Sequence, residues 1–193
     1  TNNNLFPTPD NLRLWHIVYD PDDSDPNRRY KGFLTSAGGR IPVVSSNCLN
    51  WTKLGHDPAD FPSGDAGTLT YDRDNKQFLG LLKFKSEYGR AYKLTTSTDF
   101  ENWTEPRFLF STDEEDQKLA VESIRKRLAD PTLAKPLFVH PDPSLGWREP
   151  DPPPWRGDPV WCAECYNMGV FPYEGLHLAT LMIYYPTGQS LPE

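Results

Sequence analysis

A tandem repeat of about 50 residues constrains the fold of this chain more than any other feature. Four residues of one copy recur 52 positions later in the other: Ser45, Asn50, Trp51 and Thr52 match Ser97, Asn102, Trp103 and Thr104. The pairs Tyr19-Asp20 and Tyr71-Asp72 keep the same spacing, and each leads through a polar turn to an aromatic-X-Gly sequence. A period of this length, built of short strands joined by polar turns, is typical of the blades of a β-propeller.

Composition favours strands and ordered loops over helices. Twenty of the 193 residues are proline, about twice the usual share of roughly 5%, and 13% are aromatic. The net charge of −7 argues against a surface for nucleic acid or for anionic membranes, because both need clustered lysine and arginine. No apolar run approaches the roughly 18 residues that a membrane-spanning helix needs.

The sequence predicts an all-β fold, a β-propeller of four-stranded antiparallel blades, with about three blades in this chain. A loop over residues 1–12 precedes a first blade at 13–55, a second at 63–110 and a third at 161–188. Residues 111–160 are expected to be an insertion. Apolar residues interleaved with charges over 113–135 predict one amphipathic helix in it, and 136–160 are proline-dense without periodicity.

The repeated Ser-containing segment predicts a corner after the third strand of each blade. In the second copy it reads Ser-x-Asp-x-x-x-Trp, from Ser97 to Trp103. The Ser or Asp side chain can accept hydrogen bonds from backbone N–H groups of the turn, while the indole packs between adjacent sheets. Trp51 and Trp103 are therefore expected in the core between blades, with a sugar contact as the alternative.

Carboxylates at the blade openings are the candidates for chemistry. The first strands of propeller blades line a common channel, so acids just before them converge from distant parts of the sequence. Asp65 precedes the second blade, and Glu164 precedes the third. Apolar neighbours would raise the pKa of Glu164, which suits a general acid.

The order of these parts resembles the five-bladed propeller glycoside hydrolases, the clan with families 32, 43, 62 and 68, and family 32 most of all. Glu164-Cys165 matches the Glu-Cys motif of the family's acid/base, and Asp65 matches its transition-state stabiliser by position. The Ser97 to Trp103 corner also matches, as does an Asp-Pro…Arg-Tyr-Lys string within residues 25–31. The resemblance covers about residues 13–110 and 161–188 and implies hydrolysis of a glycosidic bond with retention, without a cofactor.

Two departures from the family pattern leave alternatives open. The Asn-Asp-Pro motif of the family's nucleophile is missing, and Asp10 lies roughly where it would fall. The family closes its ring with five blades, so either this chain is part of a longer protein, or an oligomer or additional chain completes the propeller, or the blade interpretation is partly wrong. Trp15, Arg90 and Glu174 are further candidates for substrate binding, although Tyr-Glu-Gly at 173–175 is also typical of a turn.

A carbohydrate is the expected partner, and a metal site is not expected. The acidic segment 20–25 lacks the ligand spacing of a calcium loop and is interpreted as a solvated turn. Cys162 and Cys165 have no second pair of ligands for zinc. Because the nucleophile motif is missing, the alternative function is a non-catalytic carbohydrate-binding or oligomeric scaffold propeller.

Overall fold

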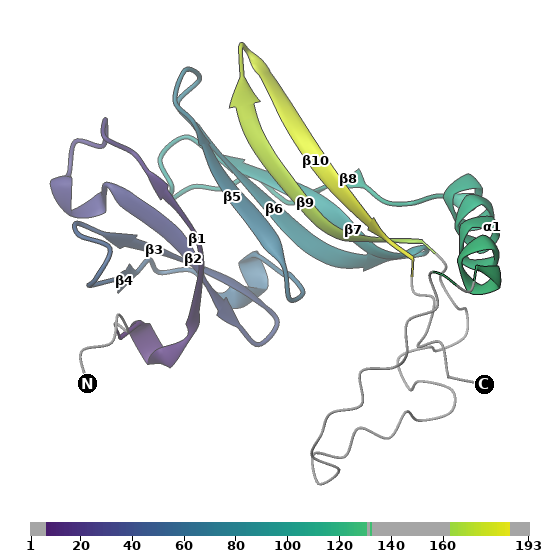
Figure 1. The fold of residues 1–193 in the computed structure, drawn as a ribbon. Helices are drawn as coiled ribbons and strands as arrows, with labels where there is room; N and C mark the ends of the chain where they lie inside the picture. Colours follow the sequence, from purple (N-terminus) through teal and green to yellow (C-terminus); the bar gives the residue numbers. More distant parts are fainter. Residues whose placement is uncertain (1–6, 131, 133–162, 186–193) are drawn as a thin grey trace, which may run out of the picture.

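The chain folds mostly into antiparallel sheets, as a computed structural model of residues 7–130, 132 and 163–185 describes it (Figure 1). The first sheet, sheet A, has the strand order β1-β2-β3-β4. Its strands are β1 (Arg13–Tyr19), β2 (Tyr30–Ser36), β3 (Gly39–Ser45) and β4 (Thr52–Lys53). Three short 3-10 helices accompany it: η1 (Pro9–Asn11), η2 (Pro26–Arg28) and η3 (Pro58–Asp60).

The second sheet, sheet B, repeats the plan of the first with longer strands. Its order is β5-β6-β7-β8. The strands are β5 (Gly67–Asp72), β6 (Gln77–Ser86), β7 (Gly89–Ser97) and β8 (Arg107–Phe110). The apolar run in β6 is buried on both faces from Phe78 to Lys83, since other sheets cover both sides of sheet B. The two hairpins expected from sequence are confirmed, and so are four strands in each of these two sheets.

The third sheet, sheet C, has two strands in the described part of the chain. The strands β9 (Glu164–Tyr173) and β10 (Leu176–Tyr184) pair along their whole length. Their two-residue turn has φ angles of 47° at Glu174 and 79° at Gly175, the left-handed values of the tight hairpin turn that twisted strands prefer. The described part of sheet C therefore has two strands and not the four that were expected. The described sheets do not close into a ring.

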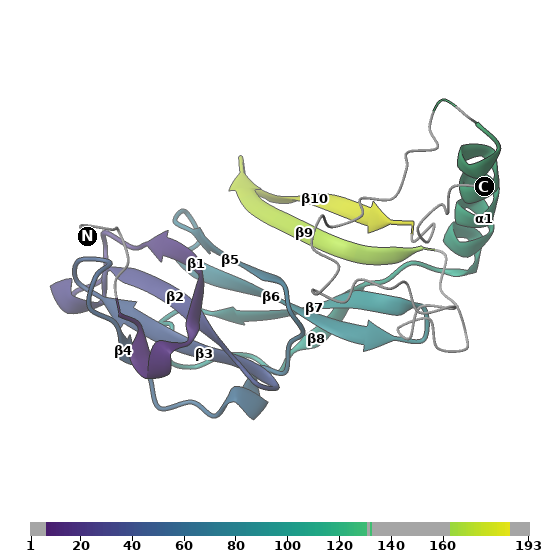
Figure 2. The same ribbon diagram turned by 60° about the horizontal axis from the view of Figure 1, so that its bottom comes forward.

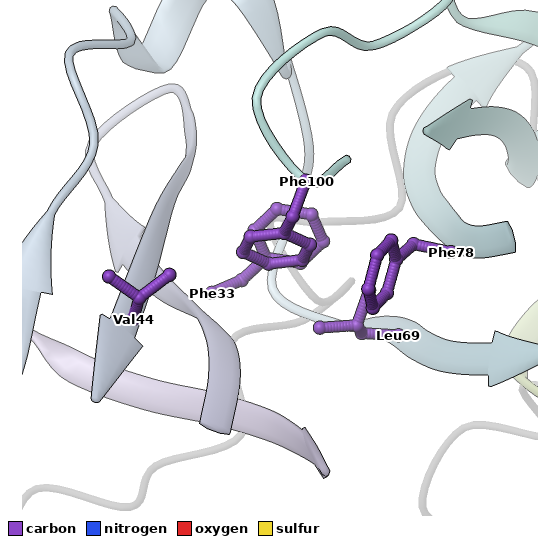
Figure 3. Packing of buried hydrophobic residues seen from close by; sticks show 5 residues of the cluster. All are labelled: Phe33, Val44, Leu69, Phe78 and Phe100. Carbon is purple, nitrogen blue, oxygen red and sulfur yellow. The ribbon is translucent and has the colours of Figure 1, made fainter. Parts of the chain in front are cut away.

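The sheets follow one another in space as they do in sequence (Figure 1 and Figure 2). The edge strand β1 lies against β5, and β5 lies against β9. Between sheets A and B a buried apolar cluster contains Phe33, Val44, Leu69, Phe78 and Phe100 (Figure 3). Between sheet B and β9 a second cluster contains Leu81, Tyr92, Cys165 and Met168. Sheet B is thus the middle layer of the three.

The corner expected after the third strand is present in both sheets. Oδ1 of Asp99 accepts hydrogen bonds from the backbone N–H groups of Glu101 and Asn102, at 2.8 and 2.7 Å. The Trp103 ring lies 5.5 Å from that of Phe33 in sheet A, between centroids, which confirms the expected packing between sheets. Trp51 is buried too, but it packs on the other face of sheet A, with Leu34 and Val43, so the expected packing between two sheets is wrong for this residue in the described part of the chain.

The predicted helix is confirmed as α1 (Glu114–Ala129), which stands at the end of the molecule opposite sheet A (Figure 1 and Figure 2). Asp113 caps its first turn, because its Oδ1 accepts hydrogen bonds from the N–H groups of Glu115 and Asp116. Within the described residues, no helix is long and apolar enough to cross a membrane. The proline-dense segment 136–160 lies outside the described residues.

The acidic segment 20–25 is not simply a solvated turn, which corrects the interpretation from sequence. Two acids of this segment bind the ammonium group of Lys31, a residue of β2 that is fully buried. That group donates to Oδ2 of Asp20 at 3.0 Å, to Oδ2 of Asp23 at 2.7 Å and to the carbonyl of Arg28 at 2.8 Å. A buried lysine needs this many acceptors to offset the cost of removing its charge from water, so Asp20 and Asp23 are structural.

Candidate functional site

One pocket brings together the two carboxylates that the sequence singled out at the blade openings. It has a volume of about 540 Å³. Its lining comprises two acids, four basic residues and parts of the β2–β3 turn and of the segment before β5: Asp65, Glu164, Lys83, Lys85, Arg90, Lys93, Gly38, Pro62, Ser63, Gly64 and Phe84. A volume of this order suits a small ligand such as one or two sugar rings.

Asp65 presents an ionised carboxylate to the pocket. The side chain is 75% exposed, and its Oδ1 accepts a hydrogen bond of 3.0 Å from Nζ of Lys83, whose side chain is only 4% exposed. This hydrogen bond lowers the pKa of Asp65 below its usual value, against a partly offsetting effect of burial. The positive charge of Arg90 lowers the same pKa further. Asp65 is therefore an acceptor of hydrogen bonds at neutral pH and not a proton donor.

Glu164 is held from sheet B by a backbone group and a side chain of one residue. The N–H of Arg90 donates to Oε1 of Glu164 at 3.1 Å, and Nη1 of Arg90 lies 3.5 Å from Oε2. The Glu164 side chain is 16% exposed. The apolar surroundings expected from the neighbouring sequence are therefore only part of its environment, because a guanidinium group sits beside the carboxylate.

The start of β9, and with it Glu164, is fixed by hydrogen bonds from the helix side. Nε2 of Gln117 donates to the carbonyl of Ala163 at 2.7 Å, and the Ala163 N–H donates to Oε1 of Gln117 at 3.1 Å. Oγ1 of Thr112 also donates to the Ala163 carbonyl, at 3.0 Å. The insertion after β8 thus sets the position of the residue just before Glu164.

The segment that carries Asp65 is anchored by a buried arginine of sheet A. Arg40 is 2% exposed. Its Nη1 donates to Oγ1 of Thr35 and its Nη2 to the carbonyl of Gly64, both at 2.8 Å. The Gly64 N–H in turn donates to the carbonyl of Lys83 at 2.7 Å. Two sheets therefore hold the backbone next to Asp65, which makes the carboxylate a fixed feature of the pocket.

Aromatic rings of sheet C lie close to the basic residues of the pocket. Nζ of Lys83 lies 4.9 Å from the ring centroid of Tyr166, and the Arg90 guanidinium lies 5.5 Å from the same centroid. Arg90 also lies 5.8 Å from the ring of Tyr184. Such contacts attract the cations to the ring faces and restrict their side chains. The cations that pair with Asp65 and Glu164 are thus themselves held in place.

The other candidates from sequence lie outside this pocket, except Arg90. Asp10 lies in η1, where its Oδ2 accepts a hydrogen bond of 2.6 Å from Nζ of Lys53. Trp15 lies on β1, and the guanidinium groups of Arg13 and Arg40 are each 5.9 Å from its ring centroid. Glu174 is exposed at the tip of the β9–β10 turn. The structure does not bring these three residues to Asp65 and Glu164.

Sequence reasoning missed the basic residues of the site other than Arg90. Lys83 and Lys85 follow Leu79 and Leu81 on the same face of β6, because alternate residues of a strand share a face. The sequence could have indicated Lys83, because it follows two apolar residues on the same face of a strand. A lysine buried at such a position needs a residue of opposite charge as its partner. No comparable signal marked Arg40, which lies next to a glycine turn.

The described residues contain no group of three or more His, Cys, Asp or Glu side chains that could hold a metal ion. The pocket combines a fixed, ionised carboxylate with a second carboxylate on a neighbouring sheet. Carboxylates of this kind can accept hydrogen bonds from sugar hydroxyls and, in pairs, can act on a glycosidic bond. Comparisons with protein-family models, with curated proteins and with solved structures find no match to this chain.

Proposed function

We propose that this pocket binds a carbohydrate and hydrolyses a glycosidic bond. One observation carries the proposal: Asp65 and Glu164, from the openings of two successive sheets, line a single pocket. Two carboxylates on one pocket are the shared requirement of glycoside hydrolases with either stereochemical outcome. Asp65 would accept hydrogen bonds from sugar hydroxyls, and Glu164 would protonate the oxygen of the leaving group.

We propose in addition that the three sheets are blades of a propeller. Each of sheets A and B runs from an edge strand, β1 or β5, outward through three further strands. Successive edge strands β1, β5 and β9 lie against one another, and apolar clusters fill the spaces between sheets. In a propeller these edge strands line the channel, which is where Asp65 and Glu164 would meet.

A mutation of Glu164 tests the catalytic role. Glu164→Gln keeps an oxygen to accept the hydrogen bond from the Arg90 N–H but cannot donate a proton as a carboxylic acid does. We expect hydrolysis of glycosides with poor leaving groups to fall by roughly 10²–10⁴-fold. Hydrolysis of dinitrophenyl glycosides should fall far less, because that leaving group needs no proton. Glu122→Gln on α1, where Glu122 pairs with Lys126, is the matched control. Equal losses on both kinds of substrate would contradict the role of Glu164 as the acid.

The anomeric configuration of the product separates two versions of the mechanism. Retention, which the family 32 resemblance implies, needs a nucleophilic carboxylate in addition to the acid Glu164, and Asp65 is not that nucleophile if it only accepts hydrogen bonds from sugar hydroxyls. No third acid lines the pocket in the described part of the chain, and Asp10 is paired with Lys53 elsewhere. Proton NMR of the first product formed distinguishes retention from inversion.

A non-catalytic carbohydrate-binding site is the second candidate. The specific observation in its favour is that each pocket carboxylate already has a cationic partner, Lys83 for Asp65 and Arg90 for Glu164. Such a site would bind sugars with the same residues and leave the bond intact. Binding without release of reducing ends, measured on one set of oligosaccharides, would favour this candidate over hydrolysis.

A further inference from the structure

The pocket carries more positive than negative charge, although the whole chain has a net charge of −7. Four basic side chains line it against two carboxylates. Two of the four are used in ion pairs, Lys83 with Asp65 and Arg90 with Glu164. The remaining two are Lys85 and Lys93. In the described part of the chain neither of them forms an ion pair.

The two remaining lysines lie on the two faces of one hairpin. Lys85 is directly opposite Arg90 in the pairing of β6 with β7, so both point toward sheet C. Lys93 is opposite Leu82 and lies on the other face, with its Nζ 5.0 Å from the ring centroid of Phe84. The two lysines without an ion-pair partner are therefore on opposite faces of the hairpin, so their positive charges are spread over the pocket and not concentrated at one place.

We infer that the carbohydrate bound by this pocket is anionic, and that Lys85 and Lys93 contact its charged groups. This inference rests on the proposed function, because it specifies the ligand of the same pocket. Lys93 is partly buried, and a partly buried cation without a carboxylate is stabilised when a ligand supplies one. A positive pocket on an acidic protein also attracts anions selectively, since the surrounding surface repels them. The carboxylates of uronic acids, sulfate esters and phosphate esters share this chemistry.

Matched pairs of sugars test the inference by calorimetry on the full chain. The first pair is trigalacturonate and its methyl ester, in which methylation removes the negative charges of the carboxylates. Mannose 6-phosphate with mannose, and a sulfated with an unsulfated galactan oligosaccharide, distinguish the sources of the charge. We expect at least one charged sugar to bind about tenfold or more tightly than its neutral partner, a difference that 1.4 kcal/mol produces. Raising the salt concentration should reduce this preference.

Lysine variants connect the preference to the two residues. The double variant Lys85→Gln/Lys93→Gln should lose most of the preference for charge while keeping affinity for the neutral partner. Lys126→Gln, on the exposed face of α1, should keep it. The inference is overturned if no charged sugar binds, if every neutral partner binds as tightly as the charged one, or if the double variant keeps the preference.

Product analysis of the same mixtures separates this inference from the proposed hydrolysis. If charged sugars bind preferentially and no new reducing ends form with any sugar, hydrolysis is rejected and the anionic site stands. If neutral and charged sugars are hydrolysed equally well, the catalytic proposal stands and the anionic site is rejected.

Discussion

The backbone N–H of Arg90 donates a 3.1 Å hydrogen bond to Oε1 of Glu164 and thereby connects β7 of the middle sheet to the start of β9. The same arginine places its guanidinium beside the second oxygen of the carboxylate, at 3.5 Å. Its charge also lowers the pKa of Asp65. Arg90 therefore contacts Glu164 directly and also lowers the pKa of Asp65, so one cation acts on both carboxylates of the pocket.

Two substitutions at Glu164 should differ in stability because of this backbone contact. Glu164→Gln keeps an acceptor for the Arg90 N–H, whereas Glu164→Ala leaves that donor without its partner. An unsatisfied donor costs about 1–3 kcal/mol where water is excluded, and the partial exposure of this site places the difference near the lower end. Urea denaturation of the two variants measures it. Equal free energies of unfolding would show that the contact does not stabilise the fold.

Arg40→Lys should loosen the segment that carries Asp65. The arginine bridges Thr35 and the Gly64 carbonyl with two nitrogen atoms of one rigid group, and a lysine ammonium cannot reach both. We expect a loss of about 2 kcal/mol in the free energy of unfolding. Faster hydrogen exchange of the Gly64 amide should accompany it. Arg107→Lys, at an exposed position of β8, is the control and should change neither quantity. Unchanged exchange at Gly64 in Arg40→Lys would contradict the anchoring role.

The corner after β3 has Asn47 where the corner after β7 has Asp99, so the two corners differ by one charge. This charge should make the free energy of unfolding depend on pH in acid. Burial raises the pKa of Asp99, but hydrogen bonds led by those from Asn102 outweigh it and lower the pKa from 3.8 to about 2. A carboxylate with a lowered pKa stabilises the fold fully above 3.8, and this contribution is lost as the pH falls through about 2. Asp99→Asn should remove this pH-dependent contribution but keep the backbone hydrogen bonds of the corner, because the amide oxygen of Asn47 accepts the same bonds in the first corner.

Asp99→Ala provides the contrast, since it removes the acceptor itself. We expect it to cost about 1 kcal/mol at pH 7, as loss of a capping side chain does. Thermal unfolding from pH 2 to pH 7 compares the three proteins. If Asp99→Asn loses as much stability as Asp99→Ala at pH 7, the two corners are not equivalent in the way their geometry indicates.

Cys165, next to the candidate acid, should resist alkylation in the folded protein. Its side chain is fully buried between sheet B and β9, and burial raises the pKa of its thiol to about 11. Only the thiolate reacts, so iodoacetamide at pH 8 should leave Cys165 unmodified until a denaturant is added. Mass spectrometry of the peptides reports the modification. Labelling at the same rate with and without denaturant would show that β9 does not remain packed on sheet B.

Much of the fold could be predicted from sequence because the repeat imposes it. The spacing from Trp51 to Trp103 located both corners, and the repeated strands and polar turns between them located most of sheets A and B. The number of strands in sheet C could not be predicted, since the third segment lacks a matching corner. Trp103 packs between sheets A and B, whereas Trp51 packs on the other face of sheet A. The repeat spacing cannot predict this difference, because it does not show which sheet covers which face.

Of the candidate site, the two acids and Arg90 could be predicted from the sequence, but not the lysines or Arg40. Asp65 and Glu164 were singled out because the openings of the expected blades should converge, and both residues line one pocket. Lys83 was missed although its place beside buried leucines of β6 was a signal, and Arg40 was missed because its role depends on a contact from sheet A to the segment before sheet B. The position of Asp10 beside Lys53 could not be inferred either, because it depends on the path of the chain before β1.

The most direct test of the central claim compares the hydrolysis rates of Asp65→Asn, Glu164→Gln and the double variant on one glycoside with a poor leaving group. The Asp65 side chain is largely exposed, so its ion pair with Lys83 contributes at most about 1 kcal/mol and Asp65→Asn should remain folded. If the two carboxylates act together, each single variant should lose roughly 10²-fold or more in rate, and the double variant should lose little beyond that. A single variant that keeps the wild-type rate would contradict the claim that Asp65 and Glu164 form one active site.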